Sequence, residues 1–179
     1  MDSKYKKIQL SEILNILNGK EEENKPYLFI NPSSSLDTFF NIKARLIDIY
    51  KLKHKLDENP DLKNEIQKEI QSSMAAGMRN GDWLVYHLGK DPKFDLVSFL
   101  KQFQFYNKDM SKPENIKKKD FVLDNKIVIK ENLVDIFGNR GIFDVRETFK
   151  FCFMSTCKVN EIEQLLKINN EFEFDVYIV

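Results

Sequence analysis

At 179 residues, with 42% hydrophobic and 12% aromatic residues, the chain is long enough to form one domain around a proper core. Its 28 basic residues equal its 28 acidic residues, and this balance excludes the basic excess of a dedicated nucleic-acid binder. No apolar run approaches the roughly 20 residues of a membrane span, and no apolar stretch of the kind found in secretory signals follows residues 1–7. We therefore expect one cytoplasmic domain, residues 1–179, without nucleic-acid or membrane partners.

Apolar periodicity and breaker residues define the expected elements of the first half of the chain. In chain order they are a helix over residues 8–17, an acidic loop at 21–23, a strand over 27–30, helices over 36–56 and 62–78, and a strand over 83–88. Gly19 ends the first helix, so residues 1–25 are interpreted as an N-terminal helix and loop. Gly81, after the third helix, is expected to adopt positive φ.

The second half begins with more polar sequence. Its expected elements are a helix over 94–103, an exposed lysine-rich stretch over 104–120, a small hairpin of 121–123 with 127–129, a short helix over 131–137 and a turn at 138–141. Residues 104–146 are therefore interpreted as an insertion that contains a hairpin.

Residues 149–156 predict a strand that is buried on both faces. Phe149, Phe151 and Phe153 alternate with Cys152 and Met154, so both sets of side chains need an apolar cover. A helix over 160–168 and a last strand over 174–179 follow, and two strands joined through a helix form a βαβ unit. The alternation of strands and helices predicts an α/β fold with a three-layer parallel sheet and flanking helices.

Ligand sites of parallel sheets lie at the carboxyl ends of strands, so residues 31–38, 87–91, 155–158 and the chain end are the places to search. The first of these occupies the place of a phosphate-binding loop, whose motif is G-x-x-x-x-G-K-S/T. Only Thr38 fits that motif, because Asn31 and Leu36 replace the glycines and Asp37 replaces the lysine. A cap on the following helix is the alternative interpretation of these residues.

The remaining strand ends offer little catalytic chemistry. His87 is a candidate general base but has no nominated nucleophile, and a structural role is the alternative. Cys152 and Cys157 are expected to be reduced thiols, and Cys157 could act as a nucleophile only by tertiary contact with a histidine. Two cysteines and two histidines without short spacing give no zinc motif.

Three stretches together resemble the last AAA+ module of dynein heavy chains. They are residues 26–37, which follow the family pattern P-x-x-F-x-x-S-P-G-x-D-P, residues 81–88, which follow its Gly-x-Trp and apolar strand, and residues 149–155, which follow F-R-L-W-L-T-S. The matches occur in the family's order. Ser33 replaces a family glycine, Lys150 replaces an arginine, and the family's Q-N pair has no counterpart.

The resemblance implies a P-loop NTPase (AAA+)-like fold in a module that does not itself hydrolyse ATP. It also implies that two sets of residues occupy vestigial positions, namely Asn31, Ser33, Ser34, Ser35, Asp37 and Thr38 in the phosphate loop, and Ser155 and Thr156 at the sensor. No cofactor and no metal are expected.

The resulting hypothesis is a non-catalytic, dynein-like domain that acts as a structural or adaptor subunit of a cytoskeletal assembly, with a cilium or axoneme as its setting and microtubule-associated proteins among its partners. Lys117, Lys118 and Lys119 are candidate partner-binding residues, and a solvated loop is the alternative. Two other hypotheses are an atypical P-loop nucleotide-binding protein or ATPase, and a small-molecule enzyme that uses Cys157 or His87.

Overall fold

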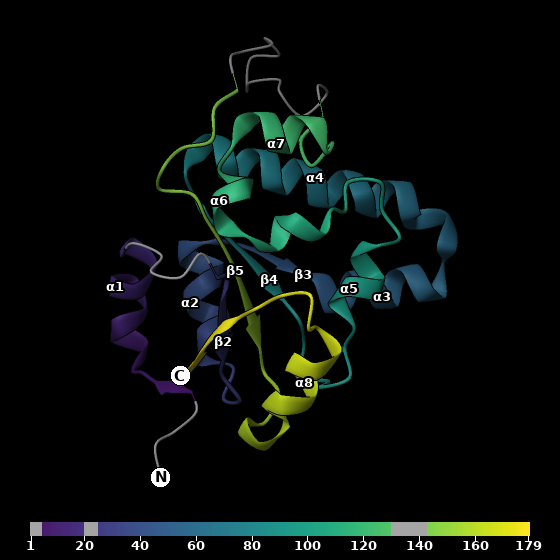
Figure 1. Cartoon of the computed structure of the whole chain (residues 1–179). Coiled ribbons are helices and arrows are strands. Elements are labelled where there is room, and N and C mark those ends of the chain that lie inside the picture. The colour runs from purple at the N-terminus through teal and green to yellow at the C-terminus, as the bar shows by residue number, and fades with distance from the viewer. Residues whose placement is uncertain (1–4, 20–24, 130–142) are drawn as a thin grey trace.

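The computed structural model describes residues 5–19, 25–129 and 143–179 as a six-stranded sheet between two layers of helix (Figure 1). The strands are β1 (Lys6–Lys7), β2 (Tyr27–Ile30), β3 (Arg45–Asp48), β4 (Trp83–His87), β5 (Lys150–Ser155) and β6 (Asp175–Ile178). They lie in the order β1-β6-β2-β5-β4-β3, and every neighbouring pair is parallel. The three-layer parallel α/β class expected from the sequence is confirmed.

The helices cover the two faces of the sheet unequally. They are α1 (Ile13–Asn18), α2 (Ser35–Lys43), α3 (Ile49–Glu58), α4 (Lys63–Asn80), α5 (Leu96–Leu100), α6 (Pro113–Ile116), α7 (Lys119–Asp124) and α8 (Ile162–Ile168). Buried side chains of α1 and α2 pack on one face, and those of α3 to α8 pack on the other. The face under α1 and α2 therefore has the thinner layer, and the larger apolar core lies on the opposite face.

The strand β5 lies in the middle of the sheet, between β2 and β4, and all six of its residues are buried. Phe151 and Phe153 belong to the larger core, whereas Cys152 and Met154 belong to the core under α1 and α2, as the alternation predicts. Lys150 is also buried, and its Nζ donates a hydrogen bond to the carbonyl of Gly19 at 3.1 Å. Because Gly19 is the C-cap of α1, this lysine holds the end of α1 against the sheet.

The helix expected over 36–56 is wrong, because the chain leaves the helical conformation at Ala44 and forms β3 between α2 and α3. Leu46 and Ile47 then pack on opposite faces of the sheet, as alternate residues of a strand do. Arg45 fixes the start of β3 through an ion pair with Asp82, with Nε and Oδ2 2.6 Å apart. The apolar residues around β3 fit a helical period equally well, so pairing with β4 decides the conformation.

The hairpin expected at 121–129 is also wrong, because α7 spans its first half and no strand forms among residues 121–129. The stretch 104–120 is not the exposed segment that its lysines suggested. Phe105, Met110 and Ile116 are at most 1% exposed and belong to the larger core. Residues 104–128 therefore cover one end of that core; Phe121 and Leu123 are half-buried, and all of the fully exposed side chains are polar.

Other expectations have mixed outcomes. Gly81 ends α4 with φ of 75°, as predicted, and Thr148 donates a hydrogen bond to its carbonyl. The two-residue strand β1 was not predicted, and Lys6 holds it beside β6 through an ion pair with Asp175. The expected acidic loop at 21–23, the helix over 131–137 and the turn at 138–141 lie outside the described residues.

Candidate functional site

The carboxyl edge of the sheet brings together the strand ends that the sequence nominated. The loops after β2, β4 and β5 are joined by backbone hydrogen bonds, from Asn31 N–H to the Ser155 carbonyl at 2.9 Å and from Thr156 N–H to the Gly89 carbonyl at 3.0 Å. The end of β6 joins them, because Val179 N–H donates to the Ile30 carbonyl at 2.9 Å. These segments form one continuous edge, as parallel topology requires.

The side chain of Asn31 fills the interior of the loop after β2. It is 1% exposed, and its Nδ2 donates to the carbonyl of Val179 at 3.3 Å. Its Oδ1 accepts hydrogen bonds from the Leu36 N–H at 3.4 Å and the Ser33 hydroxyl at 3.2 Å. A phosphate bound at the start of α2 would compete for the Leu36 N–H, a backbone donor of the first helical turn. The loop is thus satisfied by its own amide, and Ser34 adopts a left-handed conformation, φ 59°, to make the turn.

The other residues of the expected phosphate loop do not converge on a ligand position. Leu36 is fully buried in the core under α1 and α2, while Ser35 and Thr38 are exposed. The carboxylate of Asp37 points toward the end of β4, where its Oδ1 lies 3.5 Å from Nε2 of His87. A negative charge therefore occupies the position of the motif's lysine.

One ring nitrogen of His87 is hydrogen-bonded, and the other faces the carboxylate of Asp37. Its Nδ1 accepts a hydrogen bond from the N–H of Gly89 at 3.0 Å, which assigns the proton of the neutral ring to Nε2. Nε2 and the facing Oδ1 of Asp37 are both shielded from solvent, and neither has a hydrogen-bond partner among the described residues. No lone pair of His87 is left to receive a proton from Cys157, so this geometry opposes the Cys–His nucleophile.

The residues after β5 bind backbone groups. The buried hydroxyl of Ser155 donates to the Gly89 carbonyl at 2.8 Å and accepts from the Cys157 N–H at 3.2 Å. Burial raises the pKa of the Cys157 thiol, hydrogen bonding with the Ser155 side chain lowers it, and the nearby Glu161 carboxylate raises it. Both cysteines are free thiols, as expected. Ser155 therefore acts as a link between β5 and the loop after β4.

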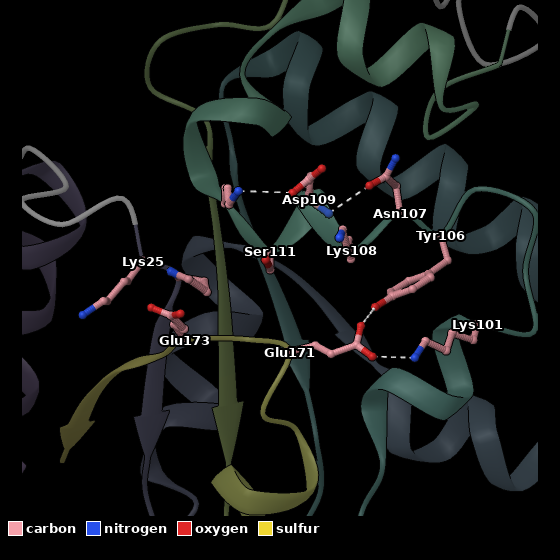
Figure 2. A pocket seen from close by; sticks show the side chains of 11 residues that line it. Lys25, Lys101, Tyr106, Asn107, Lys108, Asp109, Ser111, Glu171 and Glu173 are labelled. Atoms are coloured by element: carbon pink, nitrogen blue, oxygen red, sulfur yellow. Dashed lines mark hydrogen bonds and ion pairs between the residues drawn. The ribbon is translucent and has the colours of Figure 1, made fainter.

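A hollow with a volume of about 770 Å³ lies near the opposite edge of the sheet, before the starts of β2 and β6 (Figure 2). It is lined by charged residues of both signs, namely Lys25, Lys101, Lys108, Lys112, Asp109, Glu171 and Glu173, together with Pro26, Tyr106, Asn107 and Ser111. Sequence reasoning missed it, because its walls come from segments that are far apart in the chain and share no motif.

The carboxylate of Glu171 links the walls of this hollow (Figure 2). It pairs with the ammonium group of Lys101 and accepts a hydrogen bond from the hydroxyl of Tyr106. Lys101 contributes most to lowering the pKa of Glu171, followed by Tyr106, while burial and then Glu171 raise the pKa of Tyr106. Opposite charges thus pair across the hollow, whose lining holds four lysines and three carboxylates.

The side chains of the three lysines predicted to bind a partner lie in different surroundings and do not form one patch. Lys118 Nζ donates to Asn115 Oδ1 at 3.1 Å, Lys119 Nζ lies 3.5 Å from Asp144 Oδ1, and Lys117 lines a separate hollow beside α1. Within the described ranges, no group of three or more histidine, cysteine, aspartate or glutamate residues is arranged to hold a metal ion.

No helix among the described residues has the length and apolar character needed to cross a bilayer. Comparisons of the chain with protein-family models, with curated proteins and with solved structures found no match.

Proposed function

We propose that this chain is a non-catalytic AAA+-like domain that acts as a structural or adaptor subunit of a cytoskeletal assembly, which we place in a cilium or axoneme because of the dynein-like sequence pattern. The observation that carries the proposal is the amide of Asn31, whose Oδ1 already accepts the Leu36 N–H, a donor that a phosphate at the start of α2 would need. Because the phosphate loop is occupied by its own asparagine side chain, we infer that the domain has a structural role and does not hydrolyse nucleotide.

The order of the strands supports the AAA+ part of the proposal. The first long strand, β2, lies between the last two, β5 and β6. Dinucleotide-binding and flavodoxin-like sheets, with orders 3-2-1-4-5-6 and 2-1-3-4-5, do not place the first strand between the last two. This exclusion concerns fold class only, because one fold hosts many functions.

The charge of Asp37 adds to the case against nucleotide binding. A carboxylate about 4 Å from a phosphate oxygen near a protein surface would be repelled by about 4 kcal/mol at an effective dielectric constant of 20. Asp37 is 35% exposed, so solvent weakens this repulsion. The negative charge of Asp37 and the loop filled by Asn31 therefore both disfavour nucleotide binding.

Isothermal titration calorimetry of the full chain with Mg·ATP and with ADP tests the non-catalytic part. We expect no binding at nucleotide concentrations up to about 1 mM, that is, less than about 4 kcal/mol of binding free energy. Binding at low micromolar ATP that is lost in Thr38→Ala would overturn the proposal and favour the atypical P-loop hypothesis. Ser11→Ala, which lies in the N-terminal 3-10 turn far from this loop in the chain, is the matched control.

The size of the native complex tests the adaptor part. The chain has a mass of 21.2 kDa, so a structural subunit should sediment from its native extract in a much larger particle. Sedimentation as a free monomer would contradict the adaptor function without affecting the nucleotide result. Lys117, Lys118 and Lys119 remain candidate partner-binding residues, and their divergent contacts favour separate roles over one basic patch.

A further inference from the structure

Two Asn–Gly pairs end helices in this chain, Asn18–Gly19 at α1 and Asn80–Gly81 at α4. An asparagine before glycine is chemically labile, because a residue without a Cβ leaves its backbone nitrogen open to attack the asparagine Cγ. The glycine N–H gives up its proton, the nitrogen bonds to Cγ, and the side-chain amide leaves as ammonia. Water then opens the resulting succinimide ring to isoaspartate or aspartate.

Hydrogen bonds on both residues hold the Asn80–Gly81 pair. The Gly81 N–H donates to the Gly77 carbonyl at 2.9 Å, and the Thr148 hydroxyl donates to the Gly81 carbonyl at 3.0 Å. The side-chain amide that would have to leave is also engaged, because Nδ2 of Asn80 donates to Oδ2 of Asp82 at 3.4 Å. Attack on Cγ of Asn80 therefore requires that both the nitrogen and the amide lose their partners.

The reacting groups of the Asn18–Gly19 pair are less constrained. The side chain of Asn18 is exposed, and its amide makes no hydrogen bond within the part of the chain that the structure describes. The Gly19 N–H donates to the Ile16 carbonyl at 3.2 Å, a longer bond than that of Gly81. The helix α1 has six residues, and the ends of helices fray. The Gly19 nitrogen is therefore the more accessible of the two attacking nitrogens.

The hollow beside α1 also favours reaction at Asn18. Asn18 and Gly19 line it together with two lysines, Lys117 and Lys150, and one carboxylate, Glu147. Loss of the Gly19 proton and attack on Cγ place negative charge on the nitrogen and then on the amide oxygen. Nearby cations stabilise charge that develops in this way.

We propose that Asn18 is a site of spontaneous deamidation, and that the modification detaches the end of α1 from the sheet. Conversion to aspartate leaves the main chain unchanged, whereas isoaspartate adds one carbon to the main chain between position 18 and Gly19. The added carbon displaces the Gly19 carbonyl, which accepts a hydrogen bond from the buried ammonium group of Lys150 at 3.1 Å. Loss of that hydrogen bond frees the end of α1 from β5.

Peptide mapping by mass spectrometry tests the site in the full chain, incubated both folded and in urea. In urea, where neither pair is held by the fold, Asn18 and Asn80 should deamidate at similar rates. In the folded chain Asn18 should deamidate roughly fivefold faster or more, because the Asn80 amide has one additional hydrogen bond to break. Equal rates in the folded chain, or a faster reaction at Asn80, would overturn the site.

The variant Gly19→Ala tests the chemistry. Its methyl group hinders the attacking nitrogen, and alanine readily adopts the φ of −72° found there, so deamidation at Asn18 should slow while that at Asn80 stays the same. An unchanged rate at Asn18 in this variant would contradict attack by the Gly19 nitrogen.

Hydrogen exchange tests the detachment of α1. Amides at the end of α1 should exchange faster in aged chains that carry isoaspartate at position 18 than in fresh chains. The variant Asn18→Asp is the matched control, because it has the carboxylate without the added main-chain carbon, and its α1 amides should keep their protection. Unchanged exchange in the isoaspartate form, or an equal loss of protection in Asn18→Asp, would overturn the detachment.

Discussion

Replacing Asn169 with alanine should be one of the most destabilising single changes in this chain. The side chain is fully buried after α8; its Oδ1 accepts from the Leu96 N–H at 2.8 Å, and its Nδ2 donates to the Phe94 carbonyl at 2.9 Å. Alanine leaves both backbone groups buried without this partner, at about 1–3 kcal/mol each. We therefore expect a loss of about 2–6 kcal/mol in the free energy of unfolding.

Urea denaturation followed by circular dichroism measures this loss. With a slope of about 2 kcal/mol per molar, the midpoint should fall by about 1–3 M without a change in slope. Asn169→Asp should cost at least as much, because it places a carboxylate against the Phe94 carbonyl. The exposed Asn41, on α2, provides the control, and Asn41→Ala should stay within about 0.5 kcal/mol of wild type. A midpoint shift of less than about 0.3 M in Asn169→Ala would refute the hydrogen bonding described here.

Two further predictions concern the core and the hollow of Figure 2. Phe151→Ala should cost about 3–5 kcal/mol, because it removes a buried ring packed 4.8 Å, centroid to centroid, from that of Tyr86; a soluble variant with an unchanged melting temperature would contradict the strand packing. Lys101 and then Tyr106 lower the pKa of Glu171, so its stabilising contribution is present above the ordinary value of 4.5 and is lost as pH falls through the lowered value. The difference in unfolding free energy between wild type and Glu171→Gln should therefore narrow from pH 7 to pH 3, and a difference independent of pH would count against the pairing.

The strands that could be predicted are those with a continuous apolar run between breaker residues, namely β2, β4, β5 and β6. The strand β3 could not, because Leu46 and Ile47 continue the apolar pattern of the flanking helices and only pairing with β4 makes them a strand. Apolar residues of the insertion, such as Met110 and Ile116, follow no single period, so their burial under the lysine-rich surface was not predictable either.

The strand ends in the sequence predicted where the candidate site lies. They did not predict that the side chain of Asn31 fills the loop after β2. In the sequence, Asn31 stands where the phosphate motif has its first glycine. The carbonyl that accepts its hydrogen bond belongs to Val179, which lies 148 positions away in the chain. Asp37 and His87 were each noticed separately in the sequence. Nothing in their spacing indicated that they face each other, because β3, α3 and α4 lie between the two residues.

The position of β2 has a consequence for the synthesis of this protein. Its two neighbours, β5 and β6, are encoded more than 100 residues later, so β2 has no strand to pair with while most of the chain is being made. At a translation rate of about 5–20 residues per second, the delay between the end of β2 and the start of β6 is about 7–30 s. During that time the apolar segment Tyr27–Ile30 lacks both of its strand neighbours. Late completion of the sheet is therefore built into the order of its strands.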